Sequence, residues 1–192
     1  MESRQDWVWD GGRPSLDLVN TVRERWDGGR ELLTSPAHLG AWLHRAGLTD
    51  ATVTATGRDL DDARTLREAL DEGVRATVDA RAADAGAVDL INAWATKAPP
   101  PPASLLPGPH GVLHAERPAP ARPVATALTA IAEDGVLLLG TDDRTRIHIC
   151  ASPDCSVRFF DLSQGRRRQW CSMQRCGNRA KARAHRRRSK PT

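Results

Sequence analysis

The spacing of apolar and polar residues predicts a mainly helical body over the first three quarters of the chain. The clearest helix covers residues 59–82, where Leu60, Leu70 and Val74 share one apolar stripe. Gly73 weakens this helix without ending it. The same spacing, with capping and stop signals, predicts four further helices, over residues 14–26, 35–47, 84–96 and 124–138.

Strand signals are short and few. The Pro-rich stretch KAPPPPASLLPGPHG, residues 97–111, is typical of a loop or an edge connection. After it, GVLHAERP alternates weakly and predicts a strand in a small hairpin. RIHIC, residues 146–150, alternates as a strand, and residues 157–170 predict a strand, a turn around Ser163–Gly165 and a second strand.

All four cysteines lie in the last quarter of the chain, as the pairs Cys150-x4-Cys155 and Cys171-x4-Cys176. This clustering favours a metal site over a disulfide framework. Two short-range pairs separated by a loop let four thiolates converge on one tetrahedral ion, so we expect a single structural Zn²⁺, with an iron–sulfur centre as the minor alternative. A segment this small needs the metal to supply its folding free energy.

The x4 spacing also limits the geometry of the second pair. On a regular helix, residues five positions apart point about 140° away from each other and cannot share one ion. We therefore expect Cys171 in the turn before a helix and Cys176 in or near its first turn. The predicted fold class is thus mainly α, with a helical N-terminal domain (1–143) that carries a small β-hairpin. A zinc-stabilised hairpin-and-helix finger of the treble-clef or ribbon kind follows (144–192).

Charge is divided unevenly between these two regions. From Arg144 onward there are 14 Lys or Arg and two Asp residues, a net charge of +12, whereas residues 1–143 carry 14 basic and 22 acidic residues, a net charge of −8. A basic end on an acidic body suggests a polyanionic partner, with nucleic acid the leading candidate, and the charge alone is equally compatible with a solvated basic tail. The expected contact residues are Arg175, Asn178, Arg179, Lys181, Arg183, Arg186 and Arg187.

Four of these arginines, at positions 179, 183, 186 and 187, fall on one face of the predicted helix. Arg is suited to bidentate contact with phosphate or with the edge of guanine. Asn178 has two possible roles. Its side-chain amide could contact DNA, or it could equally cap backbone groups at the start of the helix.

At this point the sequence resembles a known family. CASPDC…WCSMQRCGNRAKARAHRRR is similar to the CGNR zinc finger, a bacterial C-terminal module, and GGRPSLDLVNT…ELLTSPAHLGAWLHRAGL resembles the start of the ABATE domain that usually precedes it. The resemblance implies a bacterial stress-induced transcription regulator, in which the four cysteines bind zinc and the finger binds DNA. It also implies a mainly helical sensing domain.

The polar residues Asp17, Asn20 and Thr21 lie inside the N-terminal signature. They are candidates for the floor of a small-molecule effector pocket, and a structural hydrogen-bond network is the favoured alternative. No Gly-rich phosphate loop, nucleophile elbow or His–Glu metalloprotease spacing occurs, which argues against an enzyme.

The sequence therefore predicts a cytoplasmic, DNA-binding transcription regulator that binds duplex DNA and has no membrane partner. No stretch reaches the ~20 apolar residues of a membrane helix, and no secretory signal is recognisable. The alternative hypothesis is a module that binds RNA or protein and acts on the transcription or translation machinery.

Overall fold

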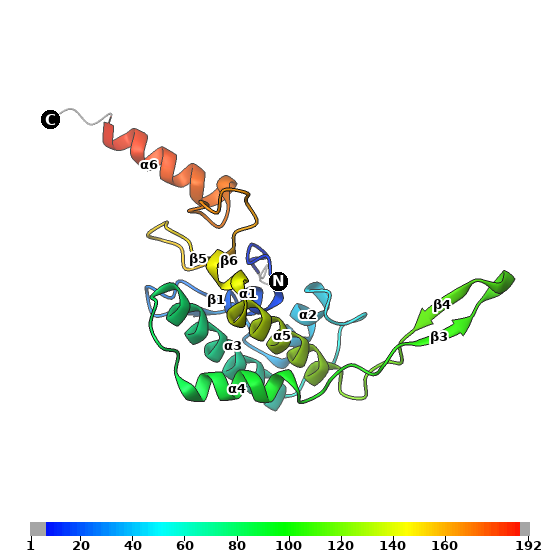
Figure 1. Cartoon of the computed structure of the whole chain (residues 1–192). Coiled ribbons are helices and arrows are strands. Elements are labelled where there is room, and N and C mark those ends of the chain that lie inside the picture. The colour runs from blue at the N-terminus through cyan, green and yellow to red at the C-terminus, as the bar shows by residue number, and fades with distance from the viewer. Residues whose placement is uncertain (1–6, 189–192) are drawn as a thin grey trace.

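The computed structural model describes residues 7–188, and Figure 1 shows their arrangement. The chain is about half helical, with three two-stranded sheets, which confirms the predicted fold class. The helices are α1 (Pro14–Val19), α2 (Pro36–Arg45), α3 (Gly57–Val78), α4 (Ala85–Ala95), α5 (Pro123–Gly140) and α6 (Asn178–Arg188). The strands are β1 (Val22–Arg23), β2 (Arg30–Glu31), β3 (Ser104–Pro107), β4 (Leu113–Glu116), β5 (Ile147–Ile149) and β6 (Arg158–Phe160).

The core of the N-terminal region lies between α3, α4 and α5, with α1 and α2 packed against them. Three of the helices begin at a side-chain cap: Ser35 caps α2, Asp84 caps α4, and Thr56 forms a capping box with Asp59 at the start of α3. α1 and α5 instead have a proline in their first turn. Leu60, Leu70 and Val74 of α3 are buried as predicted, whereas Val78, one helical turn after Val74, is 43% exposed.

α5 occupies the centre of this core. By length and composition it could cross a membrane, since its 18 residues have a mean hydropathy of 1.4. Half of it is buried inside the fold, however, and Leu128, Ile131 and Ala132 are completely covered by neighbouring helices. α5 is therefore the core helix of this region.

The predicted first helix is too long. α1 ends at Val19, because the backbone amide and the hydroxyl of Thr21 both donate to the carbonyl of Leu18, at 3.0 and 2.6 Å, in place of the next helical bond. Val22 then belongs to strand β1, which pairs with β2 across a turn at Gly28 and Gly29. Both glycines have positive φ, the conformation that lets the chain reverse there.

The predicted small hairpin is present as β3 and β4, and it projects away from the helices (Figure 1). In its register Leu105 faces Ala115 and Pro107 faces Leu113, so one side of the hairpin is apolar. This side is uncovered within the described chain, with Leu105 66% and Leu113 60% exposed.

In the C-terminal region β5 pairs antiparallel with β6, and the first cysteine pair lies in the connection between them. The predicted second strand after the Ser163–Gly165 turn is wrong, because residues 162–168 form a loop instead. This loop closes around the buried carboxylate of Asp161, which accepts hydrogen bonds from the backbone amides of Ser163 (2.8 Å) and Arg168 (2.9 Å). Those bonds replace a strand ladder.

The β5–β6 hairpin is packed into the helical region rather than standing apart from it. Ile147 and Phe160 share an apolar cluster with Leu16, Val74 and Leu138 of α1, α3 and α5. The core of the protein therefore runs across the predicted domain boundary, and the hairpin buries apolar surface that it would expose on its own.

A buried polar contact accompanies this cluster. The amide side chain of Asn20 donates to the carbonyl of Arg158 (2.9 Å) and accepts from its backbone amide (2.9 Å). The guanidinium of Arg158 is paired with both carboxylate oxygens of Asp71, at 2.7 and 3.2 Å. Burial lowers the pKa of Arg158, and the charge of Asp71 opposes that shift.

Asp71 serves more than one cation. Its carboxylate also lies 3.4 Å from Arg25 and 3.4 Å from Arg75, so one 97% buried aspartate holds three guanidinium groups together. We predict that Asp71→Asn lowers the free energy of unfolding in urea by about 3–5 kcal/mol, because a buried Arg158 would lose its partner.

The matched control is Asp62→Asn on the same helix, whose partially exposed carboxylate is 3.9 Å from Lys97. Exposed ion pairs contribute about 0–1 kcal/mol, so this variant should remain close to wild type. Equal losses in the two variants would contradict the central role of Asp71.

Candidate metal centre and basic helix

The four cysteine sulfurs converge at one point. They are buried, form no disulfide, and all lie within 4.8 Å of one another. The Sγ atoms of Cys155 and Cys171 are 3.7 Å apart, as are those of Cys171 and Cys176. Sulfurs bound at about 2.3 Å to the corners of a tetrahedron would be about 3.8 Å apart, so the cluster fits Zn²⁺. These four residues are the single zinc site of the finger.

The ligands come from two turns. Cys150 follows β5 and Cys155 precedes β6, with the tight segment Ser152–Asp154 between them. Cys171 lies in the turn before a short π-helical segment, Met173–Gly177, and Cys176 lies within that segment just before α6. The geometry inferred from the x4 spacing is thus confirmed. The wider π turn lets both sulfurs of the second pair face the same point.

Donors from the protein surround the sulfurs. The backbone amide of Cys171 lies 3.5 Å from the sulfur of Cys150, and the guanidinium of Arg179 donates to the sulfur of Cys176 at 3.2 Å. This contact raises the pKa of Arg179. Four thiolates around Zn²⁺ carry a net charge of −2, and such donors stabilise that charge.

Asp154 joins the first cysteine turn to α6. Its carboxylate is 2.6 Å from Arg183 and 3.6 Å from Arg179. The hydroxyl of Ser152 and the guanidinium of Arg183 hold the pKa of Asp154 at about 2. Two of the four arginines predicted on one DNA-binding face are therefore turned toward the zinc turn.

The other predicted nucleic-acid residues have different surroundings. Arg175 pairs with Asp10 in the N-terminal segment. The side-chain amide of Asn178 donates to the backbone carbonyl of Gln174 at 3.2 Å, so it bonds to the backbone at the start of the helix. Lys181 and Arg186 are exposed on α6. The side chain of Arg187 lies outside the described residues.

The proposed pocket residues do not form an open cluster. Asn20 is bonded to Arg158 as described above, and the hydroxyl of Thr21 donates to Leu18 and accepts from Arg67 (3.2 Å). Asp17 accepts from the backbone amide of Gly11 at 2.9 Å. All three side chains are thus engaged in contacts within the fold.

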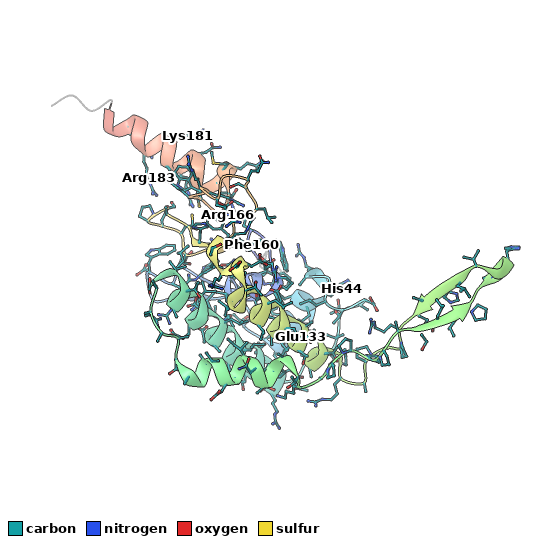
Figure 2. All side chains as sticks on the ribbon, viewed as in Figure 1. His44, Glu133, Phe160, Arg166, Lys181 and Arg183 are labelled. Atoms are coloured by element: carbon teal, nitrogen blue, oxygen red, sulfur yellow. The ribbon has the colours of Figure 1, made fainter. Side chains whose placement is uncertain are left out.

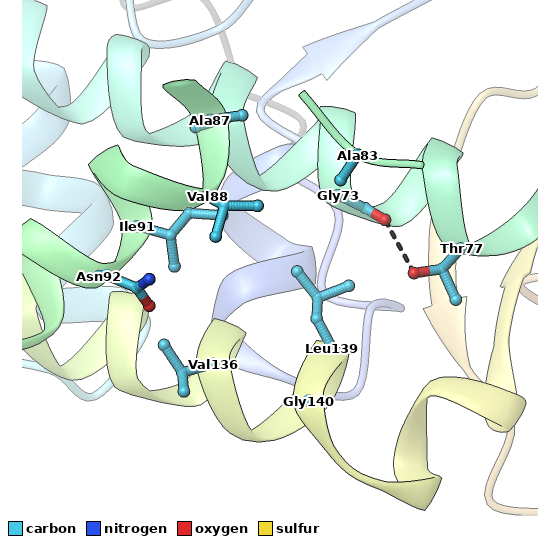
Figure 3. A pocket seen from close by; sticks show the side chains of 11 residues that line it. Gly73, Thr77, Ala83, Ala87, Val88, Ile91, Asn92, Val136, Leu139 and Gly140 are labelled. Carbon is cyan, nitrogen blue, oxygen red and sulfur yellow. Dashed lines mark hydrogen bonds between the residues drawn. The ribbon is translucent and has the colours of Figure 1, made fainter. Parts of the chain in front are cut away.

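An apolar cavity of about 290 Å³ lies elsewhere, between α3, α4 and α5 (Figure 3). Val88 and Ile91 of α4 face Val136 and Leu139 of α5 across it, and Asn92 supplies a polar group. Sequence reasoning did not find this cavity, because alternation of apolar positions shows which residues are buried but not where helices leave space between them.

Sequence reasoning also missed three acidic residues that organise the finger. Asp154 follows the turn-forming residues Ser152 and Pro153, and Asp161 comes just before the turn around Ser163–Gly165, which was the available signal. Asp71 looked like one more charged position on α3, and its role depends on an arginine 87 residues away.

The fold and the site define a zinc-finger protein, in which a helical region is followed by a four-thiolate finger. Residues 12–142 match the ABATE family, described as "Putative stress-induced transcription regulator", and residues 146–189 match the CGNR zinc finger. The chain belongs to the ABATE family, since that match covers more than half of its length. A comparison with curated proteins gave no match. The division at residues 143 and 144 remains a prediction.

We predict that Cys176→Ser lowers bound zinc from about one ion per chain to well below one, since three thiolates hold the metal more weakly than four. Metal analysis of the purified protein measures this. The control is His148→Ala, which removes a potential ligand on β5 outside the cluster and should leave the zinc content unchanged. Full zinc occupancy in Cys176→Ser would contradict the assignment.

Asp17 gives a pH-dependence prediction. Burial first, and the charge of Asp134 second, raise the pKa of Asp17 to about 6 from its ordinary value of 3.8. The folded protein therefore binds the proton more tightly than the unfolded chain, and this contribution to stability is lost as pH rises from about 4 to about 6. Asn does not titrate, so Asp17→Asn should lack this part of the fall in stability with rising pH. Above pH 6 we expect its free energy of unfolding in urea to exceed that of the wild type by on the order of 1–2 kcal/mol. An unchanged profile would contradict this.

Proposed function

We propose that this protein is a transcription regulator that binds duplex DNA through its zinc finger, in the cytoplasm. The observation that carries the proposal is α6, a basic helix that starts directly at the metal centre and extends away from the helical body (Figure 1). Its exposed cations, Lys181 and Arg186, have no ion-pair partner among the described residues. Uncompensated positive charge on a projecting helix is suited to a phosphate backbone.

The two ends of α6 have different roles in this proposal. Near the metal, Arg179 and Arg183 are engaged with Asp154 and brace the helix on the zinc turn. Farther along the helix, Arg186 continues the same face beyond the reach of that carboxylate. The first turns fix the orientation of the helix, and the exposed side chains then make the contacts with DNA.

We further infer that the N-terminal region carries the signal. Leu139 of α5 lines the apolar cavity and also packs against the cluster that holds Ile147 and Phe160 of the finger. A small, mainly apolar effector in the cavity would press on Leu139 and thereby on the finger hairpin. This route supports a sensing role, because it joins the cavity to the finger through direct packing.

The proposal is tested by fluorescence anisotropy of the full-length, zinc-loaded protein with a labelled duplex over a range of salt concentrations. We expect Lys181→Ala and Arg186→Ala each to lower the slope of log K against log salt by about 0.9, the value for one phosphate contact. Arg58→Ala, at an exposed position on α3, is the control and should keep the wild-type slope.

Two results would contradict the proposal. One is the absence of any duplex binding at low salt with zinc present. The other is retention of binding to single- or double-stranded RNA at salt concentrations that abolish DNA binding, which would favour an RNA-binding module instead.

A further inference from the structure

We propose that the loop of residues 162–168, called here the arginine loop, forms a second phosphate-binding element beside α6, through Arg166 and Arg167. This inference rests on the proposed DNA-binding function. It assigns DNA contacts to a segment outside the basic helix, and to two residues that the sequence pattern placed at the start of a second strand.

The arginine loop has a defined shape that does not depend on these two side chains. Asp161 is fully buried and its two oxygens hold the amides of Ser163 and Arg168, one near each end of the loop. The amide of Arg166 donates to the carbonyl of Ser163 at 3.3 Å, which closes the turn. The loop is thus built on the backbone, and the side chains at its tip are left available for a partner.

The three consecutive arginines of the loop differ sharply in their surroundings. Arg168 is structural: it donates to the carbonyls of Trp170 (2.8 Å) and Cys171 and lies 4.9 Å from the ring centre of Phe159. Arg166 and Arg167 are exposed. Neither forms an ion pair with any residue of the described chain, and Arg166 makes one long hydrogen bond, 3.4 Å, to Thr145.

The backbone at Arg166 adds an independent observation. Its φ is +48°, a left-handed conformation that disfavours a long side chain, although Gly165 directly before it would accept that conformation freely. Such a conformation is strained for a residue other than glycine and is typical of functional positions. The turn therefore holds a large cation where a glycine would be more stable.

The charge distribution of the finger indicates the partner. Arg158, Arg175 and Arg183 are each paired with a carboxylate. Arg146 and Arg168 are partly exposed and donate to backbone carbonyls. Among the described side chains of the finger, the exposed cations without an ion pair lie on the arginine loop and on the exposed part of α6. Figure 2 shows Arg166 at the same end of the molecule as Lys181 and Arg183.

The loop is also tied to the metal centre that carries α6. Arg168, at the end of the loop, bonds to the carbonyl of the zinc ligand Cys171. Two cationic elements joined to one rigid centre would bind adjacent phosphates of a duplex with little loss of conformational entropy.

The experiment compares two double variants of the full-length, zinc-loaded protein by anisotropy with a labelled duplex. Arg166→Ala/Arg167→Ala removes the two loop cations. Arg58→Ala/Arg117→Ala removes two exposed cations outside the finger, so the net charge of both variants is the same. We expect the loop variant to lower the salt slope by about 1.8 and to weaken binding about 10- to 100-fold at low salt. The control should stay near wild type.

The failures of the two proposals can be told apart. If the wild-type protein shows no salt-dependent duplex binding, the proposed function itself fails. If the wild type binds and Arg186→Ala lowers the slope while the loop variant does not, or does so only as much as the control, the role of the arginine loop is overturned and that of α6 stands.

Zinc content and the urea midpoint separate binding from folding. Both should be unchanged in the loop variant, whereas Arg168→Ala should lower the urea midpoint because it removes bonds to Trp170 and Cys171. If the alanine variant folds poorly, Arg166→Gln/Arg167→Gln keeps the length and polarity of the side chains and removes only the charge. An unchanged slope in that variant overturns the proposal.

Discussion

The structure depends on the way the buried guanidinium of Arg158 is satisfied. Arg158 lies on β6, a strand of the finger, and its side chain is taken up by Asp71 of α3 while its backbone is held by Asn20 after α1. A charge at this depth is tolerated only when a carboxylate and hydrogen bonds replace water. The finger hairpin can therefore occupy one position on the helical region, and the apolar cluster around Phe160 closes over the contact.

This anchoring determines what the metal has to do. The β5–β6 hairpin is held by the helical region, and the four cysteines share a small apolar cluster with Val8, Val157 and Phe159. The contacts of α6 are chiefly with the π-helical segment directly before it. Zinc then connects the anchored hairpin to the projecting helix through Cys150 and Cys155 on one side and Cys171 and Cys176 on the other. Three sets of contacts therefore fix the orientation of α6 relative to the core. Packing holds the hairpin on the helices, the metal holds the two cysteine turns together, and Asp154 pairs with Arg183 and Arg179 of α6.

The same arrangement sorts the arginines of a strongly basic segment into two groups. Those that meet a carboxylate or a backbone carbonyl hold the finger together, and the exposed ones without an ion pair in the described chain form its outward charge. Adjacent residues can belong to different groups, as Arg167 and Arg168 do, because successive side chains in a loop point in different directions. A net charge of +12 thus overstates the charge available to a partner.

The sequence by itself determined the helices, whose apolar spacing and caps are local, and the metal centre. The spacing of four cysteines in a polar segment leaves few other uses for them, so Cys150, Cys155, Cys171 and Cys176 could be assigned without a structure. The end of α1 and the loop that replaced a predicted strand could not be, since Thr21 and Asp161 compete locally for backbone groups that pattern alone assigns to a helix or a strand. Only the tertiary structure decided that Asn20 joins the two regions, that Arg183 faces Asp154 and that an apolar cavity lies between α3, α4 and α5. Each of these rests on contacts between residues far apart in the chain. A local sequence pattern does not show which distant partner a side chain will meet.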